Sequence, residues 1–479
     1  MRGTKLYSIL IQLNSKSRKR FGKYLNSPYL NGKSAPILLL NHFNKEIKRG
    51  AKGKLLKKEV FAAIYPSLNY NDQKLRLLYS DTFALLKDFL VFENYRSSKK
   101  VDKSDLADSF NELGKNKLYL KTLEEECNRL ENEGIRDSQY FLEMYNLRKM
   151  IYDQKTFETR IKDQKLESVI EHFDTYFYME KLRQGCLILS QKRLSDKDYD
   201  TDLLDIIVSY LEGKPSILQN NPSLAVYYYG YKSLAESEEE EHFKNFRTLL
   251  VKHIDLFTAK DGRELFILAL NYCGKKINLE LLDYAKIYFD LCKIGLSKGC
   301  IATKNSISTY SYKNVLAIGI LTKEFEWTEF FLEKYKELLP KKNGNDIYKL
   351  GKSALRFSTA QYLEAISILK EFYSEDPLFT LNSNTLLIRS YYEIGDLDAI
   401  GTTIEKMKVY LSRKKNLGYH ENKFKALIKY TKKFINLPLY AKAERLKLLE
   451  EINNPDNFCL LYTSPSPRDA TLSRMPSSA

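Results

Sequence analysis

One stretch of the chain alternates acidic and other residues in a pattern that could bind a calcium ion. The run Ser195–Asp202 reads SDKDYDTD, and alternating carboxylates of this kind line helix–loop–helix calcium sites. Such a site also needs Gly at its sixth position and a bidentate Glu at its twelfth, where this chain has Thr201 and Ile207. We therefore interpret the acids as the start of a helix, capped by Asp200 or Thr201.

Cysteine and histidine spacing predicts neither a metal site nor a disulfide framework. No C-x-x-C pair occurs, and the His residues do not cluster with the Cys residues, which stand at positions 127, 186, 273, 292, 300 and 459. His420-Glu421 lacks the second His of a zinc protease. Phosphate-loop, dinucleotide and nucleophile-elbow motifs are also missing from the sequence. We expect no cofactor, no metal and no enzymatic activity, with reduced, buried thiols in a cytoplasmic protein.

Composition predicts the elements that would position any site: long helices joined by short loops. The 479 residues include only 20 Gly and 12 Pro, so helix breakers are scarce. Because 43% of the residues are hydrophobic, the chain can bury a hydrophobic core. The longest apolar runs are far shorter than the roughly 20 residues of a membrane-spanning helix. Tyr (35) and Phe (25) are abundant, and we attribute them to packing between helices.

The positive charge is concentrated at the N-terminus. The chain has a net charge of +16, and residues 1–58 contain 15 Lys or Arg but a single acid, Glu46. A basic block attracts polyanions through counterion release, although such a block can also serve only as a solubilising face. The candidate polyanion-binding residues are Lys16, Arg18, Lys19, Arg20, Lys23, Lys45, Lys48, Arg49, Lys52, Lys54, Lys57 and Lys58.

Residues 1–100 are predicted to form a small basic helical domain. Short helices over Ala35–Arg49 and Leu55–Tyr65 precede a longer one over Asn71–Asn94, in which Leu and aromatic residues recur every three or four positions. The segments VFAAIYP and LRLLYSDTFALL resemble the winged-helix domain of bacterial transcriptional activators. That resemblance implies DNA binding, but no strand precedes these helices, no wing follows Phe92, and the presumptive reading helix is charge-balanced.

The clearest periodicity lies in residues 310–415. Phe325-x-x-Thr328 is followed by Pro340, Tyr362-x-x-Ala365 by Pro377 at the same offset, and Ala399 stands 34 residues after Ala365. This pattern is similar to the tetratricopeptide repeat, in which an aromatic and a small residue lie where helix B crosses helix A, and Pro ends the unit. Upstream pairs, at about 223–258 and 260–296, share the helix lengths but not the signature.

The resemblance implies an all-α fold: a tetratricopeptide-like α-solenoid, a right-handed superhelix of helix hairpins, with the small basic helical domain at its N-terminus. The expected divisions are 1–100, a helical linker or early solenoid at 101–220, and the repeat array at 221–457. The segments KYLNSPYLN, YNDQKLR and KEFEW also resemble an uncharacterised bacterial helical-repeat family, which implies the same fold and domain order.

The last residues differ from the rest in composition. Cys459–Ala479 reads CLLYTSPSPRDATLSRMPSSA and is identified as the in-frame translation of a transposon-based sequencing adapter. We expect residues 458–479 to be non-native and disordered, and the native sequence to continue differently after Asn457.

These patterns favour a non-catalytic adaptor or scaffold that binds another protein or peptide along the A helices. The candidate contacts are Asn384, Ile388, Tyr391 and Tyr392, although Ile388 and Tyr391 could equally be core residues. The alternative function is a nucleic-acid-associated regulator that binds DNA or RNA through the basic N-terminal domain. A third alternative is a structural role in a bacterial envelope or gliding apparatus.

Overall fold

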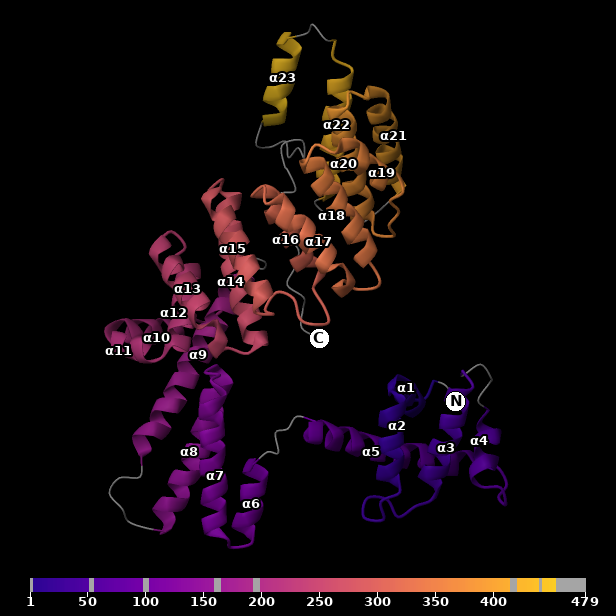
Figure 1. Cartoon of the computed structure of the whole chain (residues 1–479), viewed down its shortest axis with the longest axis vertical. Helices are drawn as coiled ribbons and strands as arrows, with labels where there is room; N and C mark the ends of the chain where they lie inside the picture. Colours follow the sequence, from indigo (N-terminus) through magenta and orange to yellow (C-terminus); the bar gives the residue numbers. More distant parts are fainter. Residues whose placement is uncertain are drawn as a thin grey trace. The chain divides into compact units, whose positions relative to one another are not determined.

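The computed structural model describes residues 3–50, 56–97, 103–158, 165–192, 199–413, 420–438 and 442–453. Over these residues the chain is all-helical, as predicted, with 23 α-helices and no β-strand, and with a single β-bridge between Ala302 and Ile307. The chain divides into two compact units, Met1–Glu126 and Cys127–Ala479 (Figure 1). Lys52, Lys54 and the segment 458–479 lie outside the described residues.

The first helices are α1 (Lys5–Gln12), α2 (Ser15–Leu25), α3 (Ala35–Lys48), α4 (Lys57–Ile64), α5 (Asp72–Ser97), α6 (Lys103–Glu112) and α7 (Asn116–Glu133). Those that follow are α8 (Ser138–Glu158), α9 (Leu166–Lys192), α10 (Asp202–Gly213), α11 (Pro215–Asn220), α12 (Pro222–Ala235), α13 (Glu240–His253), α14 (Ala259–Asn278) and α15 (Asp283–Ser297). The last are α16 (Thr309–Leu321), α17 (Phe325–Lys334), α18 (Gly344–Ser358), α19 (Tyr362–Lys370), α20 (Pro377–Glu393), α21 (Leu397–Arg413), α22 (His420–Ile435) and α23 (Lys442–Asn453).

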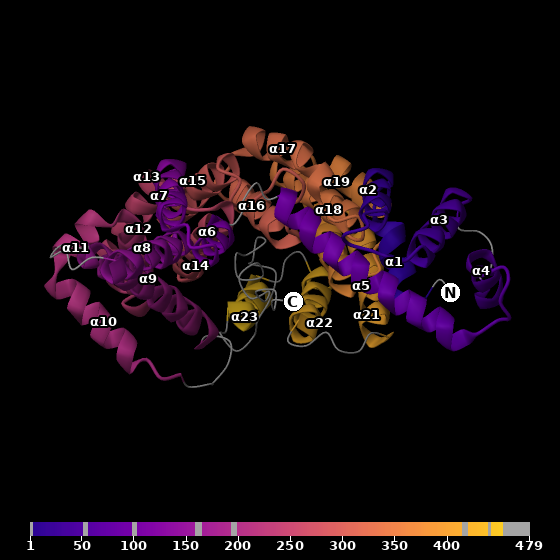
Figure 2. The same cartoon turned by 90° about the horizontal axis from the view of Figure 1, so that it is seen from below.

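In the first unit, α5 is the helix against which α1, α2, α3 and α4 all pack (Figure 2). The apolar face predicted for it is confirmed, because Leu75, Leu78 and Leu86 are buried in the core of this unit. Aromatic rings join the other helices to that core. Phe21 of α2 lies 5.1 Å from Phe89 of α5, measured between ring centroids. The unit thus has its own hydrophobic core, which leaves the polar faces of α2 and α3 outside.

The second unit is an α-solenoid, in which each helix packs mainly against its neighbours in the sequence. Three successive hairpins, α16/α17, α18/α19 and α20/α21, occupy the region where the repeat was predicted (Figure 1). The first helix of each hairpin, helix A, also contacts helix A of the next, because α16 packs on α18 and α18 on α20. Repeat packing of this kind makes a continuous core from units that cannot bury their own faces.

A single residue in the left-handed region turns the chain between the two helices of each hairpin. Lys323, Ala360 and Gly395 have φ of 59°, 59° and 76°. In each turn the next amide donates a hydrogen bond of 2.8–2.9 Å to the carbonyl oxygen five residues earlier, which closes a Schellman helix end. Glu280, with φ of 67°, makes the same kind of turn between α14 and α15. This turn therefore extends to the upstream pair at 260–296, which lacks the sequence signature.

Small residues allow the helices to approach where they cross. Thr328 and Ala365, the predicted small residues of helix B, are fully buried. A Cβ atom added to Gly319 of α16 would lie 2.2 Å from Thr328 Oγ1, far inside van der Waals contact. A Cβ added to Gly351 of α18 would lie 2.5 Å from a methyl carbon of Leu316 in α16. Close approach within a hairpin and between hairpins thus depends on glycine.

We expect Gly319→Ala to lower the free energy of unfolding by about 1–3 kcal/mol, since the added methyl overpacks the crossing with α17. Gly401→Ala is the matched control, because that glycine lies within α21 with no atom near its would-be Cβ, and there alanine should stabilise by up to about 1 kcal/mol. Urea denaturation followed by circular dichroism measures both. Equal effects of the two substitutions would contradict the proposed crossing.

The left-handed turns give a second prediction. Ala360→Gly should raise the free energy of unfolding by about 1 kcal/mol, because a residue with a Cβ is disfavoured at positive φ. The reciprocal change, Gly395→Ala, should lower it by a similar amount. The same denaturation experiment tests both, and destabilisation by Ala360→Gly would show that the alanine methyl makes a contact worth more than the backbone strain.

Candidate protein-interaction surface

Helix α20 presents a polar and aromatic stripe on the side that other helices leave open. The helix begins at Pro377, and the Asp376 carboxylate accepts a hydrogen bond of 2.9 Å from the Leu378 amide, as an N-cap does. Pro377 therefore begins helix A of the next hairpin, whereas the sequence pattern had it end the preceding unit. Four of its exposed or half-buried residues recur every three or four positions and form the stripe: Asn382, Thr385, Arg389 and Tyr392.

The predicted contact residues fall on two different sides of this helix. Ile388 and Tyr391 are core residues, with 2% and 8% of their surface exposed. Asn384 is half-buried. Tyr392 is 53% exposed and packs against Phe434 of α22, with ring centroids 5.6 Å apart. Of the four candidates, Tyr392 is the one that lies on the stripe.

The turn residues show which positions are equivalent in the three A helices. Thr385, Arg389 and Tyr392 lie ten, six and three residues before Gly395, and the same offsets from Ala360 and Lys323 select the matching positions of α18 and α16. We call the resulting set the A-helix face. Some of these residues are not fully buried and have side chains long enough to contact a ligand. They are Lys313, Leu350, Phe357, Thr385, Arg389 and Tyr392.

Arg389 is the distinctive group of the A-helix face. Its guanidinium lies over the ring of Phe357 in α18, 4.7 Å from the ring centroid. Across the described part of the chain, no hydrogen bond or ion pair reaches this guanidinium. Burial lowers the pKa of Arg389, and the nearby Glu393 carboxylate opposes that shift only in part. A partly buried cation without an ion pair carries a cost in free energy, and nothing in the sequence marked Arg389 as such a residue.

Arg356 of α18 has the opposite environment, with carboxylates from two helices beside its guanidinium. Its guanidinium forms two hydrogen bonds with the Glu329 carboxylate of α17, at 2.6 and 2.9 Å, and its Nε lies 2.9 Å from Glu364 of α19. The side chain is 17% exposed. Bidentate pairs are geometrically specific, so this network holds α18 between two B helices. It thereby supports the position of Phe357, one residue further on.

The structure divides the predicted cationic residues of the first unit into two groups. The first group has partners: Arg18 donates to the Leu10 and Leu13 carbonyl oxygens, Arg20 pairs with Glu93, Arg49 with Glu46, and Lys57 with Asp72. The second group is exposed and forms no ion pair within the described residues, and it consists of Lys16, Lys19, Lys23, Lys45, Lys48 and Lys58.

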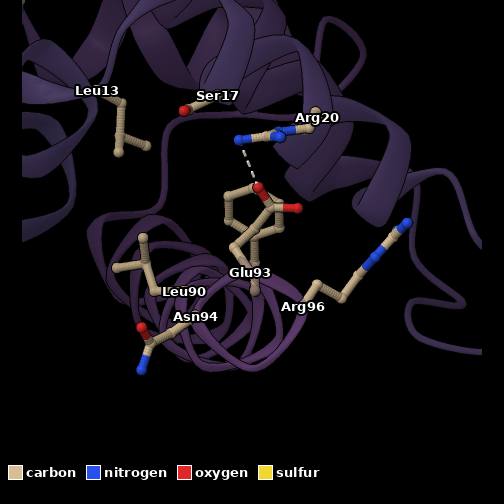
Figure 3. A pocket seen from close by; sticks show the side chains of 8 residues that line it. Leu13, Ser17, Arg20, Leu90, Glu93, Asn94 and Arg96 are labelled. Atoms are coloured by element: carbon tan, nitrogen blue, oxygen red, sulfur yellow. Dashed lines mark ion pairs between the residues drawn. The ribbon is translucent and has the colours of Figure 1, made fainter. Parts of the chain in front are cut away.

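A hollow of about 390 Å³ lies between α2 and the C-terminal part of α5. Figure 3 shows Arg20 reaching across it to Glu93, with a distance of 2.6 Å between Arg20 Nη2 and Glu93 Oε2. Leu13 and Leu90 form its apolar side, and Arg96 points away from the ion pair. The carboxylate of this pocket is therefore already paired, and the ion pair joins α2 to α5.

Cysteine and acidic residues show no further site over the described parts of the chain. Cys127, Cys186, Cys273, Cys292 and Cys300 are buried free thiols, and burial raises the pKa of the Cys186 thiol to about 12. No group of three or more His, Cys, Asp or Glu residues is placed to hold a metal. At the predicted helix start, the Asp200 carboxylate accepts a hydrogen bond from the Asp202 amide at 3.0 Å, so it is the capping group there.

Membrane insertion of the described helices is also not indicated, because none is both long and apolar enough to cross a bilayer. Comparison of the chain with protein-family models, curated proteins and solved structures finds no match.

We expect substitutions of Arg356 and Arg389 to have opposite effects on stability. Arg356→Met should lower the free energy of unfolding by about 2 kcal/mol, since it removes charge-assisted hydrogen bonds from two carboxylates. Arg389→Met should leave that free energy unchanged or raise it, because it removes a poorly solvated cation that has no anion. Denaturation midpoints of the two variants measure the difference, and equal destabilisation would show that Arg389 contributes to folding and is not held for a ligand.

Proposed function

We propose that this chain is a non-catalytic, tetratricopeptide-like scaffold that binds a peptide segment of another protein on its A-helix face. The observation that carries the proposal is Arg389, a partly buried cation without an anionic partner among the described residues. Groups of this kind are destabilising unless a ligand satisfies them. Functional sites often retain such a cost.

The chemistry around Arg389 defines the segment that would fit. Phe357 lies beneath the guanidinium and Tyr392 is exposed three residues along the same stripe. Aromatic and Arg side chains are the residue types that dominate protein–protein contacts. A segment with a carboxylate next to an apolar side chain would pair its acid with Arg389 and place its apolar group on these rings.

Two further features support the remaining parts of the proposal. Hairpins stacked through A-helix contacts present equivalent positions side by side, as in proteins whose repeats form extended binding surfaces. Five free, buried thiols fit a reducing compartment, and we propose a bacterial cytoplasmic location on that basis and on the resemblance of KYLNSPYLN, YNDQKLR and KEFEW to a bacterial repeat family.

The test is selection of peptides from a phage-displayed library of random 12-residue sequences on the immobilised full chain. We expect enrichment of peptides with an acid beside an apolar residue, and at least about tenfold weaker binding to the Arg389→Leu chain. Arg413→Leu, on the exposed end of α21, is the matched control and should bind normally. Absence of enrichment, or equal binding to the Arg389→Leu chain, would overturn the proposal.

A further inference from the structure

The exposed face of α2 carries cations at the spacing of one helical surface. Lys16, Lys19 and Lys23 stand at steps of three and four residues, so they project from the same side of the helix. All three are exposed, and none forms an ion pair within the described residues. We call these three residues the α2 stripe.

The rest of α2 is used to hold the helix in place. Asn14 caps its N-terminus through a hydrogen bond of 2.8 Å from the Ser17 amide. Phe21 and Leu25 are completely buried in the core on the side opposite the stripe. Arg20 points toward α5, where it pairs with Glu93. The apolar face of α2 is therefore buried in the core and Arg20 is held in an ion pair, which leaves the stripe as the face of the helix that is exposed.

No acid of the neighbouring helices neutralises the stripe. Residues 3–45, which include α1 and α2, contain no Asp or Glu. Of the acids of α5, Glu93 is paired with Arg20 and Asp81 with Lys33 at 2.7 Å, while Asp88, whose charge acts on Tyr24 of α2, forms no ion pair with the stripe. The positive potential above α2 consequently remains available to an external anion.

The composition of the stripe favours one class of polyanion. A membrane-surface helix inserts apolar residues into the lipid, but the apolar residues of α2 are in the core. A protein interface is centred on aromatic or apolar contacts, and the stripe has none. A nucleic-acid backbone needs only spaced cations. At a rise of 1.5 Å per residue the stripe spans about 10 Å, and one strand of a duplex carries about three phosphates over that length.

We propose that the α2 stripe binds the phosphodiester backbone of a nucleic acid, independently of base sequence, with Lys16, Lys19 and Lys23 each neutralising one phosphate. This surface is separate from the A-helix face, so a nucleic acid and a protein segment would each have a binding surface of their own on one chain. Arg18, Arg20, Arg49 and Lys57 are excluded from the contact set, because each already has a partner inside the unit.

The experiment measures binding of the full chain to a fluorescent 20-base-pair DNA duplex and a 20-nucleotide single-stranded RNA over a salt series. For the Lys16→Gln/Lys19→Gln/Lys23→Gln variant, the slope of log K against log salt should become less negative by about 2.7 on the duplex and about 2.1 on the single strand. Gln has nearly the helix propensity of Lys, and a circular dichroism spectrum checks that the variant is folded.

The matched control removes the same charge from the same unit. Lys115, Lys117 and Lys121 are also exposed. They lie just before and within the first turns of α7, which continues into the acids Glu124–Glu126. The Lys115→Gln/Lys117→Gln/Lys121→Gln chain should keep the native slope. No binding, an unchanged slope in the α2 variant, or equal slope changes in both variants would overturn the proposal. Equally tight binding of the native chain to anionic vesicles or poly-glutamate at the same salt concentration would also overturn it.

Discussion

A residue held in the left-handed conformation determines the geometry of each hairpin from α14 to α21. It ends helix A and reverses the chain, and helix B begins two or three residues later. Because the turn has the same form each time, equivalent residues of successive A helices face the same way. The A-helix face exists only because these turns repeat. Counting back from Lys323, Ala360 and Gly395 identifies the equivalent positions in the three A helices.

The close crossing of helices depends on the same turns. Gly319 and Gly351 lie where a side chain would collide with Thr328 and Leu316. Elsewhere in the second unit aromatic rings fill the space between packed helices, as the composition suggested. Phe243 and Tyr272, for example, stack with centroids 4.0 Å apart. Each such ring buries a large area. This burial helps to stabilise the many short helical hairpins of the chain.

Charge is used in three different ways in this protein. Arg356 is bound by two carboxylates and serves the packing of three helices. Arg389, at a different position in the next A helix, lies on an aromatic ring and forms no ion pair among the described residues. The lysines of the α2 stripe are fully hydrated and face solvent. The stability cost of a cation without an ion pair rises with its burial, so among these cations the cost is largest for the partly buried Arg389.

Sequence alone determined the helical class, the hairpins of residues 310–415 and the basic character of the N-terminal unit, because these depend on composition, local periodicity and net charge. It also located the small residues Thr328 and Ala365 at helix crossings. The register that relates equivalent positions of the A helices could not be predicted, since Lys323 and Ala360 adopt a backbone conformation that neither residue type signals. Which cations are free was likewise decided by tertiary structure, because Arg18, Arg20 and Arg356 find partners on segments or helices that the sequence does not place beside them.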